Sequence, residues 1–324
     1  MLSQKVYSQF PNSARDSLSL LSLDLYTNQQ KHWQMLADGV SALKNVQTRS
    51  VDCGTFSVRL QYNQKRIVST GAKVDAASIK ERKCFLCVGN LPAEQQGVLF
   101  KEKYLILCNP MPIFKEHFTI SHIDHIPQSI EEQILTLLAL AKELSPEYSV
   151  FYNGPKCGAS APDHMHFQAS PSGLIPAECE VIERRKIERH IGGVSISTVK
   201  DYGRSVIVLE GNSEQEMELS FLRLTRAIRV VMKTNEEPMM NVIGSYINGI
   251  WRLIVFVRSK HRPTVFFKEG NDKILISPAA VDIGGLIVTP MEKDFHTVDA
   301  ETIQSIYKEV SISSELLNTI VEKI

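Results

Sequence analysis

Apolar residues in the first 150 positions follow two spacings, one of three to four residues and one of two. Apolar side chains recur at helical spacing from Leu18 to Val40, which predicts helix over about residues 15–46. Residues 129–144 repeat the pattern. There Ser129 is the expected N-cap, acidic residues occupy the first turn, and a lysine lies near the end. Two amphipathic helical regions are therefore expected in the first half of the chain.

Alternation with a period of two predicts strands between and after these helices. Residues 55–63 alternate as a half-buried strand, with apolar side chains on one face and polar ones on the other. Residues 103–123 are typical of two strands around a turn that contains two prolines. Two further strands are expected over residues 147–154 and 161–170.

The same order of strands and helices begins again after about residue 180. The pattern predicts a hairpin over 241–260 that turns at Asn248-Gly249. Further strands are expected at 205–211 and 284–290, and helices at 214–233 and 299–310. The expected fold class is α+β, with two halves that each have an antiparallel sheet and packed helices.

We expect three segments along the chain. Residues 1–50 form an N-terminal helical extension, 51–185 a first half and 186–324 a second half. The sequence does not define the boundary between the halves sharply, because residues 178–190 show no break in their pattern. Two domains also agree with a length of 324 residues.

Composition narrows the classes of protein that fit. The chain is 43% hydrophobic with zero formal net charge, so no general basic field favours nucleic acid or an anionic membrane. Its longest apolar runs are far shorter than the roughly 18 residues of a membrane span, and its first residues have no secretion-type apolar core. Four of the six cysteines are scattered, as is typical of reduced thiols. We therefore expect a cytoplasmic protein.

Residues 153–170, NGPKCGASAPDHMHFQAS, carry the clearest chemistry. Side chains on a strand alternate, so His164, His166 and Gln168 would share one face. An exposed polar strand face is the ordinary explanation for one such histidine, but not for His-x-His-x-Gln after a glycine-rich loop. Neutral imidazole can attack phosphorus. Glycines at 154 and 158 let backbone N–H groups approach a phosphate, where Ser160 would be a further donor.

These residues resemble the active-site signature of the histidine-triad superfamily. The most similar branch contains galactose-1-phosphate uridylyltransferases, diadenosine tetraphosphate phosphorylases (ATP adenylyltransferases) and GDP-L-galactose phosphorylase. The resemblance implies that His166 is the nucleophile, that Gln168 and Ser160 hold the transferred phosphoryl group, and that main chain near His164 orients the His166 ring. Asn153 and Gly158 belong to the same signature as phosphate-site residues. The resemblance covers most of residues 50–300.

Cys84-x-x-Cys87 suggests half a zinc site, a redox pair or two buried free thiols. Its surroundings do not match a thioredoxin-type pair, and zinc needs two more ligands, which histidines commonly supply. From the residues alone, His117, His122, His125 and His164 are candidates. The resemblance implies Cys84, Cys87, His125 and His164 as a closed structural zinc site, with His122 as the alternative third histidine.

Further nucleotide contacts are implied only by the resemblance. They are Asn63 and Arg66 ahead of the cysteines, Asn109 in the proline-containing turn, and Arg258 and Lys260 after an apolar strand. Arginine and lysine side chains are well suited to bind phosphate groups. However, the first two segments could equally be ordinary turns, and the basic segment could equally be a solvent-exposed loop. Residues 274–290 also resemble the C-terminal half of that branch, which is a degenerate unit, and no His-x-His occurs in the second half of this chain.

The expected activity is nucleotidyl transfer. A nucleoside monophosphate would pass through a covalent nucleotidyl-histidine to phosphate or a sugar phosphate. Gln168 can hydrogen-bond but cannot protonate a leaving group, which favours phosphate leaving groups over simple hydrolysis. The alternatives are a dinucleoside polyphosphate hydrolase and a silent nucleotide-binding sensor. Mg²⁺ can accompany polyphosphate substrates. The base, the sugar and the oligomeric state stay open.

Overall fold

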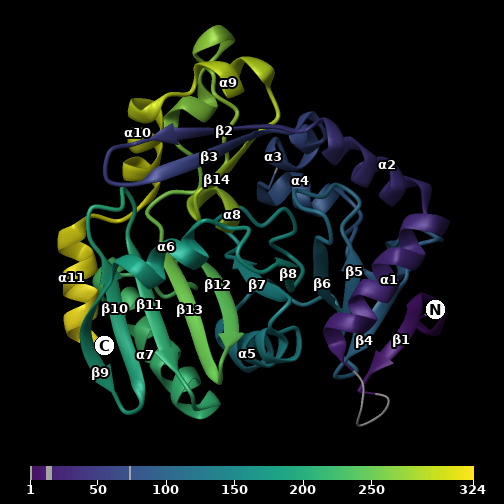
Figure 1. Ribbon diagram of the computed structural model, residues 1–324, viewed down its shortest axis with the longest axis horizontal. Helices are drawn as coiled ribbons and strands as arrows, with labels where there is room; N and C mark the ends of the chain where they lie inside the picture. Colours follow the sequence, from purple (N-terminus) through teal and green to yellow (C-terminus); the bar gives the residue numbers. More distant parts are fainter. Residues whose placement is uncertain (1, 12–16, 73) are drawn as a thin grey trace.

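The structure is a computed structural model that describes residues 2–11, 17–72 and 74–324. It has a sheet of eleven strands, a second sheet of three, and helices packed on both faces of the large sheet (Figure 1). The expected α+β class is confirmed. The strands are β1 Val6–Phe10, β2 Gln47–Asp52, β3 Ser57–Tyr62, β4 Gly97–Phe100, β5 Tyr104–Cys108, β6 Phe118–His122, β7 Tyr148–Asn153, β8 His166–Pro171, β9 Arg185–Ile191, β10 Val194–Val199, β11 Val206–Gly211, β12 Met240–Ile247, β13 Ile250–Val257 and β14 Leu286–Thr289.

The helices differ in length and in the face of the sheet that they cover. Those that pack on one apolar face include α1, α5, α7 and α11, and the other face carries α6, α8 and α10. The helices are α1 Leu18–His32, α2 Gln34–Ala42, α3 Ile67–Thr70, α4 Ala76–Glu81, α5 Ile134–Glu143, α6 Ala177–Arg184, α7 Glu214–Met232, α8 Ala280–Ile283, α9 Glu292–Thr297, α10 Ala300–Val310 and α11 Ser314–Lys323.

The sheets of the two halves are joined edge to edge. The order of the large sheet is β1-β4-β5-β6-β8-β7-β12-β13-β11-β10-β9, and the halves meet where β7 pairs antiparallel with β12. In that pair Asn153 lies opposite Asn241, and Val150 lies opposite Gly244. Both strands are buried on both faces, which explains their nearly continuous apolar sequence. One continuous sheet therefore runs through both halves.

The three-stranded sheet also joins the two halves. Its order is β14-β3-β2, and β14 from the second half runs parallel to β3 from the first, with Ile287 opposite Leu60. This sheet packs with α8 and α10 in a second apolar core, which includes Phe56, Leu60 and Tyr307. The segment between β3 and β4 is thereby held above the large sheet, where it forms part of the site described below.

The N-terminal segment is more than a helical extension. The helix expected over 15–46 is two helices, α1 and α2, because Trp33 between them is extended; residues 15 and 16 lie outside the described residues. Before them, β1 pairs in parallel with β4 and so adds a strand to the large sheet. Figure 1 shows α1 beside β4 and β5.

Two local predictions have different outcomes. The hairpin is confirmed: β12 and β13 are joined by Asn248 and Gly249, both at positive φ, as a tight two-residue turn requires. The N-cap prediction for Ser129 is wrong. Helix α5 begins at Ile134 after a 3₁₀ turn, and the Ile130 N–H donates to the half-buried Glu237 carboxylate at 2.7 Å instead.

Over the described part of the chain, every helix is too short or too polar to cross a lipid bilayer.

Candidate active site

A cavity of about 670 Å³ lies on the face of the large sheet opposite α1 and α5, at the junction of the two halves. The first half contributes β5, β6, β7 and β8, the loop 154–160 and the segment between β3 and β4. The second half contributes Arg262, Ser277, Ala279 and Asp282. A cavity of this size with a few polar groups is typical of a nucleotide-sized ligand.

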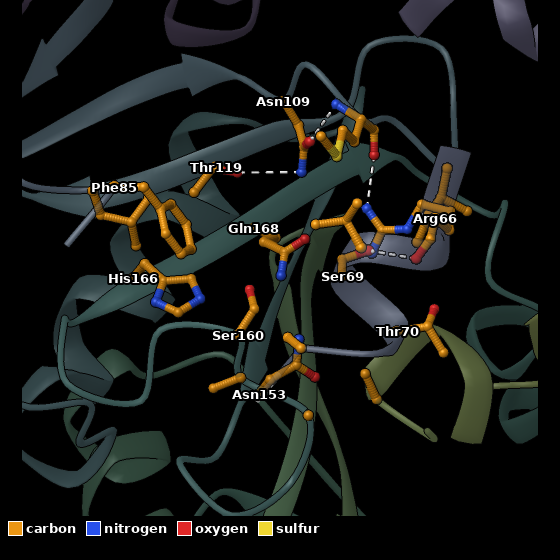
Figure 2. Close-up of a pocket in the computed structure, with 18 of the residues that line it drawn as sticks. Arg66, Ser69, Thr70, Phe85, Asn109, Thr119, Asn153, Ser160, His166 and Gln168 are labelled. Carbon is orange, nitrogen blue, oxygen red and sulfur yellow. Dashed lines mark hydrogen bonds between the residues drawn. The ribbon is translucent and has the colours of Figure 1, made fainter. Parts of the chain in front are cut away.

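Strand β8 delivers His166 and Gln168 to this cavity. Alternate residues of the segment, Met165 and Phe167, are fully buried in the apolar core on the opposite face. His164 precedes the strand and is also fully buried, but it faces the cysteine pair. The expected alternation therefore holds for His166 and Gln168, which line the cavity together with Ser160 (Figure 2).

The His166 ring has a defined orientation and protonation. Its Nδ1 lies 2.8 Å from the His164 carbonyl oxygen, so Nδ1–H donates and Nε2 carries the lone pair. Burial lowers the pKa of His166 to about 4, although the same hydrogen bond opposes the shift. The ring is therefore neutral near pH 7. A buried neutral imidazole with a free lone pair in a cavity has the chemistry of a nucleophile.

The main chain of His166 is held by Gln128, which the sequence did not single out. Gln128 Oε1 accepts the His166 N–H at 2.8 Å, and its Nε2 donates to the His166 carbonyl at 3.0 Å and to the Asn153 carbonyl at 2.9 Å. This buried amide therefore pairs with the backbone of His166 as a neighbouring strand would. Nothing in its local sequence distinguishes Gln128 from a loop residue.

His117 fixes the side chain of Gln168. Its Nδ1 accepts the Ile113 N–H at 3.2 Å, so Nε2–H is the donor to Gln168 Oε1 at 2.8 Å. The Gln168 Nε2 group is then left to donate into the cavity. Burial lowers the pKa of His117 to about 3, which keeps this ring neutral. The sequence offered His117 only as a metal ligand, and the structure gives it this different contact.

The glycine-rich loop places three more groups around His166. Asn153 Oδ1 accepts from Asn241 Nδ2 at 2.9 Å and from the Ala280 N–H at 2.7 Å, which leaves its Nδ2 group for a ligand. Gly158 has a φ of +96°, and a Cβ there would lie 2.7 Å from the Ala279 Cβ, so this position requires glycine. Figure 2 shows Ser160 between His166, Gln168 and Asn153.

Cys84, Cys87, His125 and His164 form a compact cluster beside the cavity. Their ligand atoms all lie within 4.8 Å of one another. Cys84 Sγ is 3.3 Å from His164 Nδ1, and Cys87 Sγ is 3.2 Å from His125 Nδ1. Tetrahedral zinc with S and N ligands implies separations of about 3.5 Å. The four residues therefore fit a tetrahedral metal site.

The surroundings of the cluster also fit a metal site. His164 Nε2 donates to the His122 carbonyl at 2.8 Å, and His125 Nε2 lies 3.6 Å from the Asp163 carboxylate. Such outer contacts typically orient metal-bound imidazoles. The alternative ligand His122 is not part of the cluster, because its Nδ1 accepts the Asp124 N–H at 3.0 Å.

Of the expected nucleotide contacts in the first half, Arg66 and Asn109 line the cavity and Asn63 does not. Arg66 donates to the Met111 carbonyl at 2.7 Å, and burial lowers its pKa to about 10 while the charge of Asp282 opposes the shift. Asn63 is buried and donates to the Pro112 carbonyl at 3.2 Å, so it supports the cavity wall instead.

In the second half, the expected phosphate ligands Arg258 and Lys260 lie away from the cavity. Arg258 is 1% exposed, and its guanidinium donates to five acceptors, among them Asn241 Oδ1 at 2.6 Å. Lys260 pairs with Glu309 at 2.9 Å on the surface. We therefore do not retain these two residues as ligands.

Arg262, in the same segment, does line the cavity. Its guanidinium donates to Ser277 Oγ and to the Ala72 carbonyl, each at 2.9 Å, and stacks on Phe266. Among the ion pairs of residues 2–11, 17–72 and 74–324, none joins Arg262 to a carboxylate. The basic segment reaches the cavity through His261 and Arg262 rather than through the two residues that the resemblance implied, and its sequence does not distinguish them.

Comparisons with known proteins agree with this arrangement. A domain of unknown function, DUF4922, matches residues 25–171, and the GDPGP1-like, C-terminal domain matches residues 178–324. Yeast Ap4A phosphorylase Apa2 in complex with Ap4A aligns with a TM-score of 0.58 at 13% identity, over 89% of this chain and 97% of that chain. Its complex with AMP aligns with a TM-score of 0.56 at 15% identity, over 86% and 95%. No curated protein sequence matches the chain.

Proposed function

We propose that this chain, which matches the GDPGP1-like C-terminal domain over residues 178–324 and shares the fold of yeast Ap4A phosphorylase, belongs to the histidine-triad branch that its sequence resembles and transfers a nucleoside monophosphate group through His166. The observation that supports this most is the neutral His166 ring, whose Nδ1–H is bonded to the His164 carbonyl while Nε2 is left for the cavity. A site that only binds nucleotides has no need of a positioned nucleophile.

The first step forms a phosphorus–nitrogen bond. The Nε2 lone pair of His166 attacks the α-phosphorus of the nucleotide, and the bond to the bridging oxygen breaks with its electron pair on that oxygen. The Nδ1–H bond to the His164 carbonyl offsets the positive charge that develops on the ring. Gln168 Nε2, Asn153 Nδ2 and Ser160 are the donors for the phosphoryl oxygens.

The second step returns the electron pair to His166. An oxygen of inorganic phosphate or of a sugar phosphate attacks the phosphorus, and the phosphorus–nitrogen bond breaks. Neither Gln168 nor the neutral His117 behind it has a proton to give to a leaving group near pH 7, so leaving groups that are already stable anions are favoured. Arg66 and Arg262 would bind the further phosphates of donor and acceptor.

Zinc fits the cluster of Cys84, Cys87, His125 and His164 and would have a structural role there. Such an ion supplies rigidity and leaves no open position for substrate. It would fix the His164 residue, whose carbonyl orients the nucleophile. Mg²⁺ would enter only with a polyphosphate substrate.

Mass spectrometry of the intact protein tests the proposal. Wild type, His166→Ala and the surface control His296→Ala are incubated with UDP-glucose, GDP-sugars, ADP-glucose or diadenosine tetraphosphate and desalted at mildly alkaline pH. We expect a gain of one nucleoside monophosphate in wild type and the control but not in His166→Ala. No adduct with any donor would count against transfer through His166.

Rates with and without an acceptor separate transfer from hydrolysis. Transfer or phosphorolysis predicts that turnover depends on added phosphate or sugar phosphate. Equal release of monophosphate with and without an acceptor would identify a hydrolase instead. Nucleotide binding without turnover or adduct would identify a sensor.

A further inference from the structure

The N-terminal segment forms one end of the cavity. Helix α2 contributes Met35, and it packs against the turn after β5 so closely that a Cβ on Gly39 would lie 2.2 Å from the Pro110 carbonyl oxygen. The walls at this end are mostly apolar. They consist of Met35, Leu91, Pro92, Leu107 and Pro110.

Gln95 is a buried polar side chain in this apolar wall. It is 5% exposed, lines the cavity, and donates from Nε2 to the Cys108 carbonyl at 3.1 Å. That bond fixes which end of the amide is nitrogen. Its Oε1 accepts no hydrogen bond from the part of the chain that the structure describes, so it is left as an acceptor for a ligand.

A second buried glutamine holds the loop that carries Gln95. Gln29 of α1 is 1% exposed, and its amide donates to the Glu94 carbonyl and accepts the Gln96 N–H, each at 3.0 Å. The backbone is therefore fixed on both sides of Gln95. The side-chain amides of Gln29 and Gln95, from distant parts of the sequence, therefore hold this loop rigidly. Gln95 Oε1 is the acceptor that they place at this end of the cavity.

The order of the strands places this end on one side of the nucleophile. Gln95 is bonded to β5, Thr119 of β6 comes next in the cavity wall, and His166 lies on β8. From β5 to β8 is two strand spacings, about 10 Å. Asn153 of β7 lies on the other side of β8 from β5, and its Oδ1 accepts the Ala280 N–H of the second half. The apolar end thus suits a base, and the side with Asn153 suits anions.

We propose that Gln95 determines which nucleobase the protein accepts. The base would lie between the apolar side chains, and Gln95 Oε1 would accept a hydrogen bond from an N–H group on the edge of the base. Bases differ in where they present N–H groups, and a base without a donor there leaves a buried acceptor unpaired. This inference rests on the proposed function only in taking the ligand to be a nucleotide.

Binding of nucleoside monophosphates tests the inference without any turnover. Calorimetry would compare AMP, GMP, UMP and CMP on wild type, Gln95→Leu and the control Gln96→Leu, whose side chain bonds to the Gln4 carbonyl outside the cavity. We expect wild type to prefer one base. Gln95→Leu should weaken binding of the monophosphate with that base by about five- to tenfold. It should change the affinity for the other three monophosphates by less than twofold. Gln96→Leu should keep the preference.

A second variant guards against a folding defect at Gln95. Gln29→Met removes both bonds that hold the loop, and the expected result is a smaller base preference with binding retained. Equal weakening of all four monophosphates in the Gln95 variant, or no base preference in wild type, would overturn the inference. A preference that depends on Gln95 in a protein that forms no His166 adduct would uphold the inference while the proposed function fails.

Discussion

The Nε2 atom of His117 lies 2.8 Å from Oε1 of Gln168, and this contact sets the direction of the Gln168 amide. His117 is itself fixed by the Ile113 N–H, which donates to Nδ1. A backbone group, an imidazole and an amide thus form a chain of bonds that ends with a donor in the cavity. The glutamine is turned to donate into the cavity because the Ile113 N–H bond to Nδ1 leaves the proton of the neutral His117 ring on Nε2.

Loss of His117 should therefore slow transfer more than it weakens binding. In His117→Ala, Gln168 can turn its oxygen toward the phosphoryl group, and we expect kcat to fall by about tenfold with KM changed less than threefold. His117→Gln can still donate to Gln168 and should recover part of the rate. Steady-state kinetics measures kcat and KM for each variant, with the nucleotide donor that forms an adduct on the wild-type protein as the substrate. A His117→Ala enzyme with wild-type kcat would show that Gln168 orients without this contact.

His117 also predicts how stability depends on pH. Its pKa is about 3 in the folded protein and about 6.5 in an unfolded chain, because burial disfavours the charged ring. Between these values the unfolded chain binds the extra proton, so this contribution to stability is present above pH 6.5 and is lost as the pH falls. The effect is at most about 1.4 kcal/mol per pH unit.

Urea unfolding at pH 7, 6 and 5 measures this slope. We expect the free energy of unfolding of wild type to fall more steeply than that of His117→Gln, which has no titrating group at this position. Other buried histidines contribute to both proteins equally. Parallel pH profiles would mean that His117 takes up its proton over the same pH range in the folded protein as in the unfolded chain.

The metal cluster predicts a clear difference between two neighbouring histidines. Protein purified without chelator should contain about one zinc per chain, and Cys84→Ser or His125→Ala should contain well under half of that. His122→Ala should keep its zinc, because His122 Nδ1 is bonded to the Asp124 N–H. Elemental analysis gives the metal content, and thermal unfolding should show a lower Tm only for the variants that lose zinc. Zinc lost from His122→Ala but kept in His125→Ala would reverse the assignment.

Local patterns predicted most of the elements near the site. The period of two in residues 161–170 placed His166 and Gln168 on one face, and the Asn248-Gly249 pair predicted the hairpin. Both depend on neighbours in sequence. The pairing of β7 with β12, and of β3 with β14, joins strands about 90 and more than 200 residues apart, and nothing in either strand's own sequence specifies its partner.

The residues that hold His166 and Gln168 in place were missed for the same reason. Gln128 and His117 act through contacts 38 and 51 residues away along the chain, and each stands in an ordinary loop or strand-edge sequence. Strand β1 was missed because its five residues lack regular alternation: three are half-buried, Gln9 is exposed and Phe10 is buried. Burial and distance, rather than residue type, distinguish these positions.

Arg258 and Arg262 provide the sharpest test of how the second half serves the cavity. They are four residues apart and chemically identical, but Arg258 is buried with all its acceptors in the protein, while Arg262 faces the cavity. Arg258 NH1 donates to Asn241 Oδ1, and Asn241 Nδ2 in turn donates to Asn153 Oδ1. Under the proposed function, Arg258 would support a phosphate site from behind, and Arg262, which lines the cavity, would bind the phosphate itself.

We therefore expect opposite results from matched substitutions to glutamine. Arg258→Gln leaves buried carbonyl groups unpaired and should lower the free energy of unfolding by at least about 2 kcal/mol. Arg262→Gln should change stability by less than about 1 kcal/mol but raise KM for a phosphate-containing donor or acceptor by about tenfold or more. Urea unfolding measures the free energy of unfolding of the two variants, and steady-state kinetics measures their KM values. A stable Arg258→Gln with a raised KM would restore Arg258 as the ligand and remove Arg262 from that role.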